Sequence, residues 1–138
     1  MEIEIGKGKT GRRAYGFDEI TIVPSRRTRD PEDVDISIQI DKLKMEIPCL
    51  ASAMDGVVDV NLAIKMGKLG GMAVLNLEGI QTRYENPGEQ LEKIASFSKE
   101  EATRKMQEIY QEPIKEELIA KRVKQIKEGG VTAIASIT

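Results

Sequence analysis

The segment from Ile47 to Gly79, IPCLASAMDGVVDVNLAIKMGKLGGMAVLNLEG, constrains the fold more than any other part of the sequence. It contains a short uncharged run, CLASA, then a helical pattern over Val60–Leu69, and then a second uncharged run, MAVL. Such runs are typical of strands that are buried on both faces of a parallel sheet. Asp59 is placed to cap the helix and Gly70-Gly71 to end it. The segment therefore predicts a β-α-β unit with short connections and a right-handed crossover.

The residues after this unit predict more helices and a further strand. Helices are expected over 87–94 after an Asn-Pro pair, from Ser98 to about Tyr110, and over 115–127. Two glycines end the last helix, and the following run, VTAIASIT, predicts the third strand. The many charged side chains between Lys99 and Lys127 are expected to lie on solvated helix faces.

The residues before the unit have a different pattern. In DVDISIQIDKLKMEIP, apolar and polar side chains alternate on both sides of Asp41-Lys42. Alternation around a two-residue polar turn predicts a β-hairpin. We therefore expect two parts in this chain: an N-terminal extension with a hairpin over 1–48, and a parallel α/β part over 49–138.

The predicted order of strands and helices indicates a fold class. Parallel strands alternating with helices, after an N-terminal hairpin, are typical of the start of a (β/α)₈ TIM barrel, which takes ~250 residues. A chain of 138 residues would supply about three of the eight strands. We expect an α/β fold that is the N-terminal part of such a barrel, truncated at the third strand. The alternative is an open three-stranded sheet that dimerises.

Composition excludes several classes of function. Lys and Arg number 21 and Asp and Glu 23, and aromatic residues are scarce, so we expect no nucleic-acid partner. No apolar run approaches the ~18 residues of a membrane span, and the N-terminus has no apolar signal core. With no histidine and one cysteine, we expect neither a metal site nor an internal disulfide in this chain. A cytoplasmic location is expected.

Three motifs are predicted to have no catalytic role. GKGKT at Gly6–Thr10 lacks the glycine that a phosphate-binding loop has five positions before its Gly-Lys pair. Cys49 is expected to be a buried, inert thiol, because the chain has no histidine to activate it. Arg26, Arg27 and Arg29 could clamp a phosphate, but an ordinary surface loop is the favoured interpretation.

The residues that follow the first two parallel strands are the candidates for a binding site, because parallel barrels carry their active sites at the carboxyl ends of the strands. Ser52 offers a hydroxyl group, and Met54 offers a soft apolar surface that suits a flat heterocycle. Asn76 follows the second strand and occupies the equivalent rim position. The alternative is a well-packed strand end with no ligand.

Two stretches of this sequence resemble the IMP dehydrogenase/GMP reductase family. YGFDEITIVPS is similar to an N-terminal element of the family, and ASAMDGVVDV is similar to the motif that follows its first barrel strand. Together with VLNLEGIQTRYE and MQEIYQEPIK, these stretches resemble the IMP-dehydrogenase-related subfamily that lacks the paired CBS insert. The resemblance extends to Thr138.

The resemblance implies a (β/α)₈ barrel, usually a tetramer, that binds a purine nucleotide at the carboxyl ends of its strands. IMP dehydrogenases oxidise IMP to XMP with NAD⁺, using a loop cysteine and typically a monovalent cation. GMP reductases use the same thiol and NADPH to convert GMP to IMP. Ser52 and Met54 match positions that contact the nucleotide, and Met54 would lie against the base. The catalytic cysteine and the cation ligands belong to later strands, so no catalytic residue is expected in this chain.

One departure from the family pattern affects the expected activity. Where the family often has His-His or His-Lys after the second strand, this chain has Asn76-Leu77. That pair helps to define the cofactor side, so Asn76 is a candidate for either the cofactor rim or the substrate rim. Three functions stay open: an IMP dehydrogenase, a GMP reductase, and a non-catalytic nucleotide-binding or assembly module.

Overall fold

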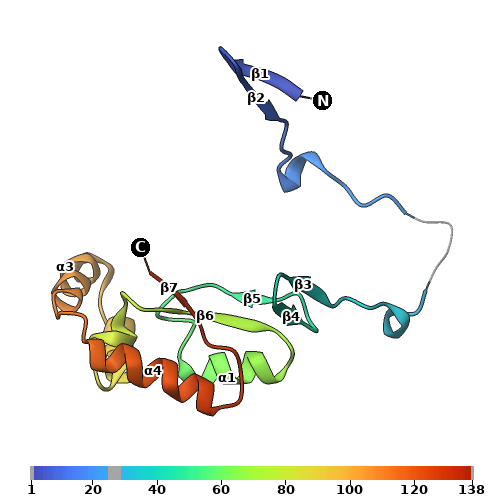
Figure 1. The fold of residues 1–138 in the computed structure, drawn as a ribbon. Coiled ribbons are helices and arrows are strands. Elements are labelled where there is room, and N and C mark those ends of the chain that lie inside the picture. Colours follow the sequence, from blue (N-terminus) through green and yellow to red (C-terminus); the bar gives the residue numbers. More distant parts are fainter. Residues whose placement is uncertain (1, 25–28, 138) are drawn as a thin grey trace. The chain divides into compact units, whose positions relative to one another are not determined.

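The structure is a computed structural model that describes residues 2–24 and 29–137. The chain divides between Asp35 and Ile36 into two compact units, and each is considered by itself (Figure 1). The first unit holds an antiparallel two-stranded ribbon and two short 3₁₀ helices. These elements are β1 (Glu2–Gly6), β2 (Lys9–Arg12), η1 (Phe17–Glu19) and η2 (Pro31–Asp33).

The second unit begins with two short strands, β3 (Ile38–Ile40) and β4 (Leu43–Met45), which pair antiparallel. The predicted turn at Asp41-Lys42 joins them, and Asp41 adopts the left-handed conformation with a φ of 52°. Aspartate tolerates this conformation better than most residues, so the turn chemistry and the alternating pattern agree. The contacts between residues divide the chain at 35/36. The division predicted at 48/49, between an extension and a barrel part, stays a prediction.

A parallel three-stranded sheet follows, with the strand order β5-β6-β7, as the α/β prediction requires. Helix α1 joins the first two strands, and η3, α2, α3 and α4 lie between the second and the third. The bounds are β5 (Leu50–Ala51), α1 (Val60–Lys68), β6 (Met72–Asn76), η3 (Ile80–Thr82), α2 (Pro87–Ala95), α3 (Lys99–Tyr110), α4 (Glu116–Glu128) and β7 (Ile134–Ser136). The Asp59 carboxylate accepts a hydrogen bond from the Leu62 amide, which confirms the predicted cap of α1.

The core lies between the sheet and two helices on one of its faces. Helices α1 and α4 contact each other and run beneath the strands in Figure 1. Alternate residues of the strands meet them there, and the buried centre consists of Val58, Ala63, Ala73, Leu75 and Ile126. The strand register places the remaining residues on the opposite face: Leu50, Met72, Val74, Asn76, Ile134 and Ser136. We refer to this second face as the helix-free face.

Two sequence predictions are wrong in the described residues. Cys49 is exposed, not buried, because it lies directly before β5, and in the described residues β5 pairs with β6 alone. Arg122 is 7% exposed and lies under η3, although it belongs to the charge-rich segment that was expected to form solvated helix faces. In both cases the position within the sheet and its covering helices decides burial, and the local sequence pattern does not show it.

Candidate functional site

The chain turns sharply where β5 ends, and this corner exposes the residues that were proposed to bind a ligand. The Met54 amide donates to the Ser52 carbonyl at 2.8 Å, and the Met54 carbonyl accepts from the Val57 and Val58 amides at 2.9 and 2.8 Å. Val58 is 1% exposed and fixes the corner to the core. Ser52 is exposed and Met54 is 53% exposed, so both side chains are free to meet a ligand.

The side chain of Asp55 ties the corner to three other segments. Its carboxylate accepts hydrogen bonds from the Asn76 amide group at 3.2 Å, from the Ile80 backbone N–H at 2.9 Å and from the Tyr110 hydroxyl at 2.5 Å. These donors come from the end of β6, from η3 and from the last residue of α3. Asp55 is therefore the residue that joins the carboxyl ends of β5 and β6 to the helical segment above them.

The Asp55 carboxylate fits because residue 79 has no side chain. A Cβ atom built on Gly79 would lie 1.8 Å from Oδ1 of Asp55 and 2.3 Å from its Cγ. Such a separation is far inside van der Waals contact, so any other residue at this position would displace the carboxylate. The backbone of Gly79 is extended, with a φ of −96°, and it is the close approach that requires glycine here.

Asn76 is the last residue of β6, and both ends of its amide group bond within the chain. Its nitrogen donates to Asp55, and its oxygen accepts from the Glu78 N–H at 3.0 Å. Asn76 pairs in register with Ser136, whose carbonyl accepts from the Leu77 amide at 3.1 Å. This geometry makes Asn76 an organiser of the rim, and a direct contact with cofactor or substrate stays a prediction.

Arg83 adds a second connection between the rim and the end of α3. Its guanidinium group donates to the Glu78 carbonyl at 3.0–3.1 Å and also to the Glu112 carbonyl. The guanidinium carbon lies 5.8 Å from the centre of the Tyr110 ring, which is within the range of a cation–π interaction. The Tyr110 ring is thus held between a cation and the Asp55 carboxylate.

The surroundings of Tyr110 raise the pKa of its phenol above the ordinary value. Burial is the largest cause, followed by the hydrogen bond to Asp55 and by the negative charge of Asp55, while Arg83 acts in the opposite direction. A raised pKa means that the folded protein holds the phenolic proton more tightly. The hydroxyl group consequently stays a donor to Asp55 as the pH rises through 10.

This leads to a prediction for alkaline titration. In protein labelled at the tyrosine ζ carbon, the Tyr110 signal should titrate above the ordinary tyrosine pKa of about 10. Asp55→Asn should lower the pKa of Tyr110 because it removes the negative charge, and Arg83→Met should raise it because it removes the positive charge. If the pKa of Tyr110 is the same in both variants as in the wild type, the contact with Asp55 is contradicted.

The other predicted motifs lie away from this corner. Gly6–Thr10 forms the end of β1, the turn and the start of β2, so it is not the strand-to-helix turn of a phosphate-binding loop. Arg26 and Arg27 lie outside the described residues, and Arg29 is exposed. Within 2–24 and 29–137, no group of three or more His, Cys, Asp or Glu residues could hold a metal ion. The helices in these ranges are all too short or too polar to cross a membrane.

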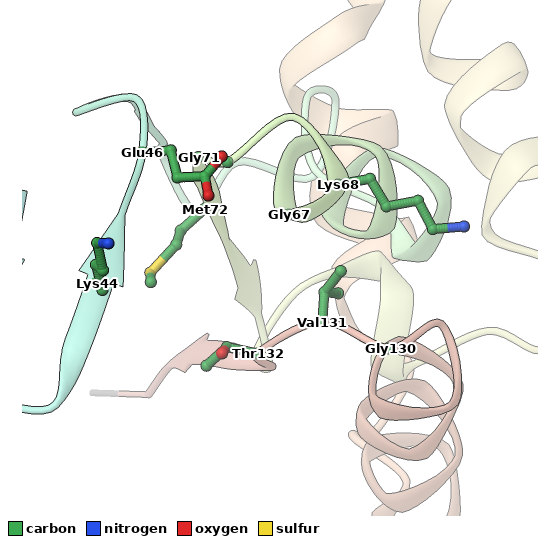
Figure 2. A pocket seen from close by; sticks show the side chains of 10 residues that line it. Lys44, Glu46, Gly67, Lys68, Gly71, Met72, Gly130, Val131 and Thr132 are labelled. Atoms are coloured by element: carbon green, nitrogen blue, oxygen red, sulfur yellow. The ribbon is translucent and has the colours of Figure 1, made fainter. Parts of the chain in front are cut away.

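A cavity of about 330 Å³ lies at the opposite ends of the strands (Figure 2). Its lining includes Lys44 and Glu46 at β4, and Met72, Val131 and Thr132 at the starts of β6 and β7. In parallel barrels the amino-terminal ends of the strands contribute to stability, and the carboxyl ends carry the chemistry. We therefore place the candidate site at the Ser52–Asp55 corner and not in this cavity.

Comparison with known proteins identifies relatives along almost the whole chain. Residues 14–136 match the model of a protein family that is described as "IMP dehydrogenase / GMP reductase domain". An uncharacterized oxidoreductase of Mycobacterium tuberculosis is 40% identical over 141 residues, and one of Mycolicibacterium smegmatis is 38% identical over 141 residues. Each alignment covers 99% of this chain and 38% of the relative, so the chain spans about two fifths of their length.

Two further similarities concern a named enzyme and a solved structure. The inosine-5'-monophosphate dehydrogenase of Methanocaldococcus jannaschii is 37% identical over 65 residues, which are 47% of this chain and 13% of that enzyme. The crystal structure of an IMP dehydrogenase/GMP reductase-like protein from Corynebacterium glutamicum superposes with a TM-score of 0.81 at 34% identity. That superposition covers 99% of this chain and 38% of the Corynebacterium chain.

Proposed function

The chain belongs to the IMP dehydrogenase/GMP reductase family, and from this premise we propose that it is part of a purine-nucleotide oxidoreductase that converts IMP to XMP with NAD⁺. The observation that carries the proposal is the Ser52-Ala53-Met54-Asp55 corner. It lies at the carboxyl end of a parallel strand, exposes Ser52 and Met54, and falls within the residues that match the family. The relatives include an uncharacterized oxidoreductase and an inosine-5'-monophosphate dehydrogenase, which supports this class of reaction.

We further propose that residues 49–138 form the first strands of a (β/α)₈ barrel. The strands are parallel and stand in chain order, and α1 and α4 contact each other on one face of the sheet. A doubly wound sheet would need helices on both faces, whereas a barrel keeps them all outside. In this arrangement the helix-free face becomes the interior of the barrel. An open sheet that dimerises through that face is the alternative.

The proposed roles follow from what each side chain presents. The Ser52 hydroxyl group would hydrogen-bond the nucleotide, and Met54 would lie against the purine ring. Holding the base in one orientation assists every later step because the reacting atoms then meet in a fixed geometry. The catalytic thiol and the ligands of a monovalent cation are proposed to belong to other strands of a homo-oligomeric protein, a tetramer or larger.

The cofactor site receives less from this chain than the nucleotide site does. When bound, NAD⁺ supplies the acceptor for the hydride that leaves the purine. Of the described rim residues, Asn76 is the one proposed to face it, and its amide already bonds to Asp55 and Glu78. Asn76 therefore fits a place beside the cofactor in which it shapes the rim of the site through its bonds to Asp55 and Glu78.

This chain spans about two fifths of the length of its relatives, so the reaction is tested in the complete protein. Incubation with IMP and NAD⁺ is expected to produce NADH, which is followed by its absorbance. Oxidation of NADPH with GMP, and no reaction with IMP and NAD⁺, would instead identify a GMP reductase. Tight IMP binding without turnover of either substrate would favour a non-catalytic module. Neither binding nor turnover would contradict the proposal.

We predict that Ser52→Ala raises the KM for the nucleotide about fivefold to tenfold and leaves kcat nearly unchanged. Loss of one hydrogen bond to a polar ligand has about this effect when the interaction is equal in the ground and transition states. The matched control is Ser96→Ala, since Ser96 is an exposed serine whose hydroxyl donates to the Lys93 carbonyl of α2. Equal kinetics for both variants would exclude Ser52 from the binding site.

A further inference from the structure

The segment between β6 and α4 contains two helices that contribute no residue to the buried core. Neither α2 nor α3 has a buried residue, although both are amphipathic. The two helices contact each other, and α2 also contacts η3. A helix with so little buried surface owes its position to a few specific contacts.

Polar contacts at its carboxyl end hold α3 to the rim. The Tyr84 hydroxyl donates to the Ile109 carbonyl at 2.8 Å, and Arg83 donates to the Glu112 carbonyl just after the helix. The Tyr110 hydroxyl donates to the Asp55 carboxylate at 2.5 Å. Of these three contacts, only that of Tyr110 reaches the corner of β5, across 55 positions of sequence.

Asp55 directly follows Met54, so the position of the Asp55 carboxylate is coupled to the backbone conformation that orients the Met54 side chain. The Met54 carbonyl is fixed from one side by the Val57 and Val58 amides. The Asp55 carboxylate fixes the corner from the other side, and it receives its shortest hydrogen bond from Tyr110. The corner is thus held between the core and α3.

We propose that Tyr110 is a positioning residue for the nucleotide: through Asp55 it holds Met54 in the orientation that receives the purine ring, and it makes α3 a wall of the site. The role at the nucleotide rests on the proposed function. The mechanical part, in which Tyr110 orients Met54 through Asp55, does not need a nucleotide. Tyr110 does not touch the reacting atoms and acts only through Asp55.

The chain offers a matched pair of variants for a test in the complete protein. Tyr110→Phe removes the hydroxyl that bonds to Asp55 and keeps the ring under Arg83. Tyr84→Phe removes a hydroxyl that bonds to the same helix end, but it does not touch the corner. Both changes remove one phenolic hydrogen bond, so a general loosening of α3 should affect both variants alike.

The first measurement is made without nucleotide, on protein labelled at the methionine methyl groups. We expect the Met54 methyl resonance to shift or broaden in Tyr110→Phe and to stay unchanged in Tyr84→Phe. An unchanged Met54 resonance in Tyr110→Phe, or an equal change in both variants, would overturn the proposal. This outcome is independent of whether the protein binds IMP.

The second measurement is the affinity for IMP and the steady-state kinetics. We expect Tyr110→Phe to raise the Kd and the KM for IMP about threefold to tenfold, with a smaller change in kcat, and Tyr84→Phe to match the wild type. If the wild type itself does not bind IMP, the proposed function fails while the methyl spectrum still decides the role of Tyr110. If the spectrum changes but the affinity does not, Tyr110 orients the corner but does not serve the nucleotide, and the proposal is overturned.

Discussion

Replacing Gly79 by alanine is expected to cost about 3 kcal/mol of unfolding free energy, although it adds a single methyl group. The new Cβ would lie 1.8 Å from Oδ1 of Asp55, so the carboxylate must leave its place. Its departure removes the hydrogen bond to the Ile80 N–H, and Ile80 is fully buried. A buried amide without a partner costs about 1–3 kcal/mol, and overpacking costs a similar amount.

Urea denaturation of the complete protein, followed by circular dichroism, measures this loss. Gly88→Ala is the matched control because it is the same chemical change in the first turn of α2. The nearest atom to its new Cβ would be 3.6 Å away, which is ordinary contact. Since alanine favours helix over glycine by up to about 1 kcal/mol, this variant should be neutral or stabilised. Equal stabilities for the two variants would mean that Asp55 does not occupy the space beside Gly79.

Arg122→Met is expected to destabilise the protein by about 3 kcal/mol as well, for a different reason. The guanidinium group of Arg122 donates to the carbonyls of Gln81, Tyr84 and Glu85 at distances between 2.8 and 3.2 Å. Methionine would retain most of the apolar stem but none of these donors. The buried Gln81 carbonyl would then be left without this donor, and the Tyr84 and Glu85 carbonyls would lose theirs in a partly buried place. An unpaired buried polar group is the costly outcome.

Lys124→Met serves as its control on the same helix. The Lys124 ammonium lies 3.7 Å from the Glu128 carboxylate, and both side chains are more than 60% exposed. Surface ion pairs of this kind contribute about 0–1 kcal/mol, so this variant should differ little from the wild type. Because the hydrogen-bond acceptors of Arg122 are neutral, most of the loss in Arg122→Met should remain at high salt, which screens only the weaker attraction of Arg122 to the Glu85 carboxylate. A loss that disappears in high salt would indicate an ordinary surface charge.

Much of the parallel α/β unit could be predicted because its signals are local. The cap at Asp59, the glycines that end α1 and α4, and the uncharged runs at β6 and β7 each act within a few residues. β5 was predicted over 49–53 but comprises only Leu50–Ala51. The chain leaves the sheet early because the hydrogen bonds of the corner begin at Ser52.

The role of Asp55 could not be predicted in this way. Ser52 and Met54 were singled out from chemistry and from a motif, but the partners of Asp55 lie 21, 25 and 55 positions further along the chain. No local pattern marks Tyr110 as one of them. The one available signal was glycine at position 79, whose requirement becomes evident only when the carboxylate beside it is known. The burial of Arg122 could not be predicted either, because its partners are backbone carbonyls, which every residue type has.

The helix-free face of the sheet has a consequence for folding. Leu50 is 55% exposed there, and Val74 and Ile134 share that face with it. Apolar side chains lower the free energy of a fold only when something shields them from water. Within the described residues, Met72 on this face is shielded, with 8% of its surface exposed, whereas Leu50 remains largely in contact with water. A surface that covered Leu50, whether made of further strands or of a second copy, would therefore add to the stability of the strand that carries the Ser52–Asp55 corner.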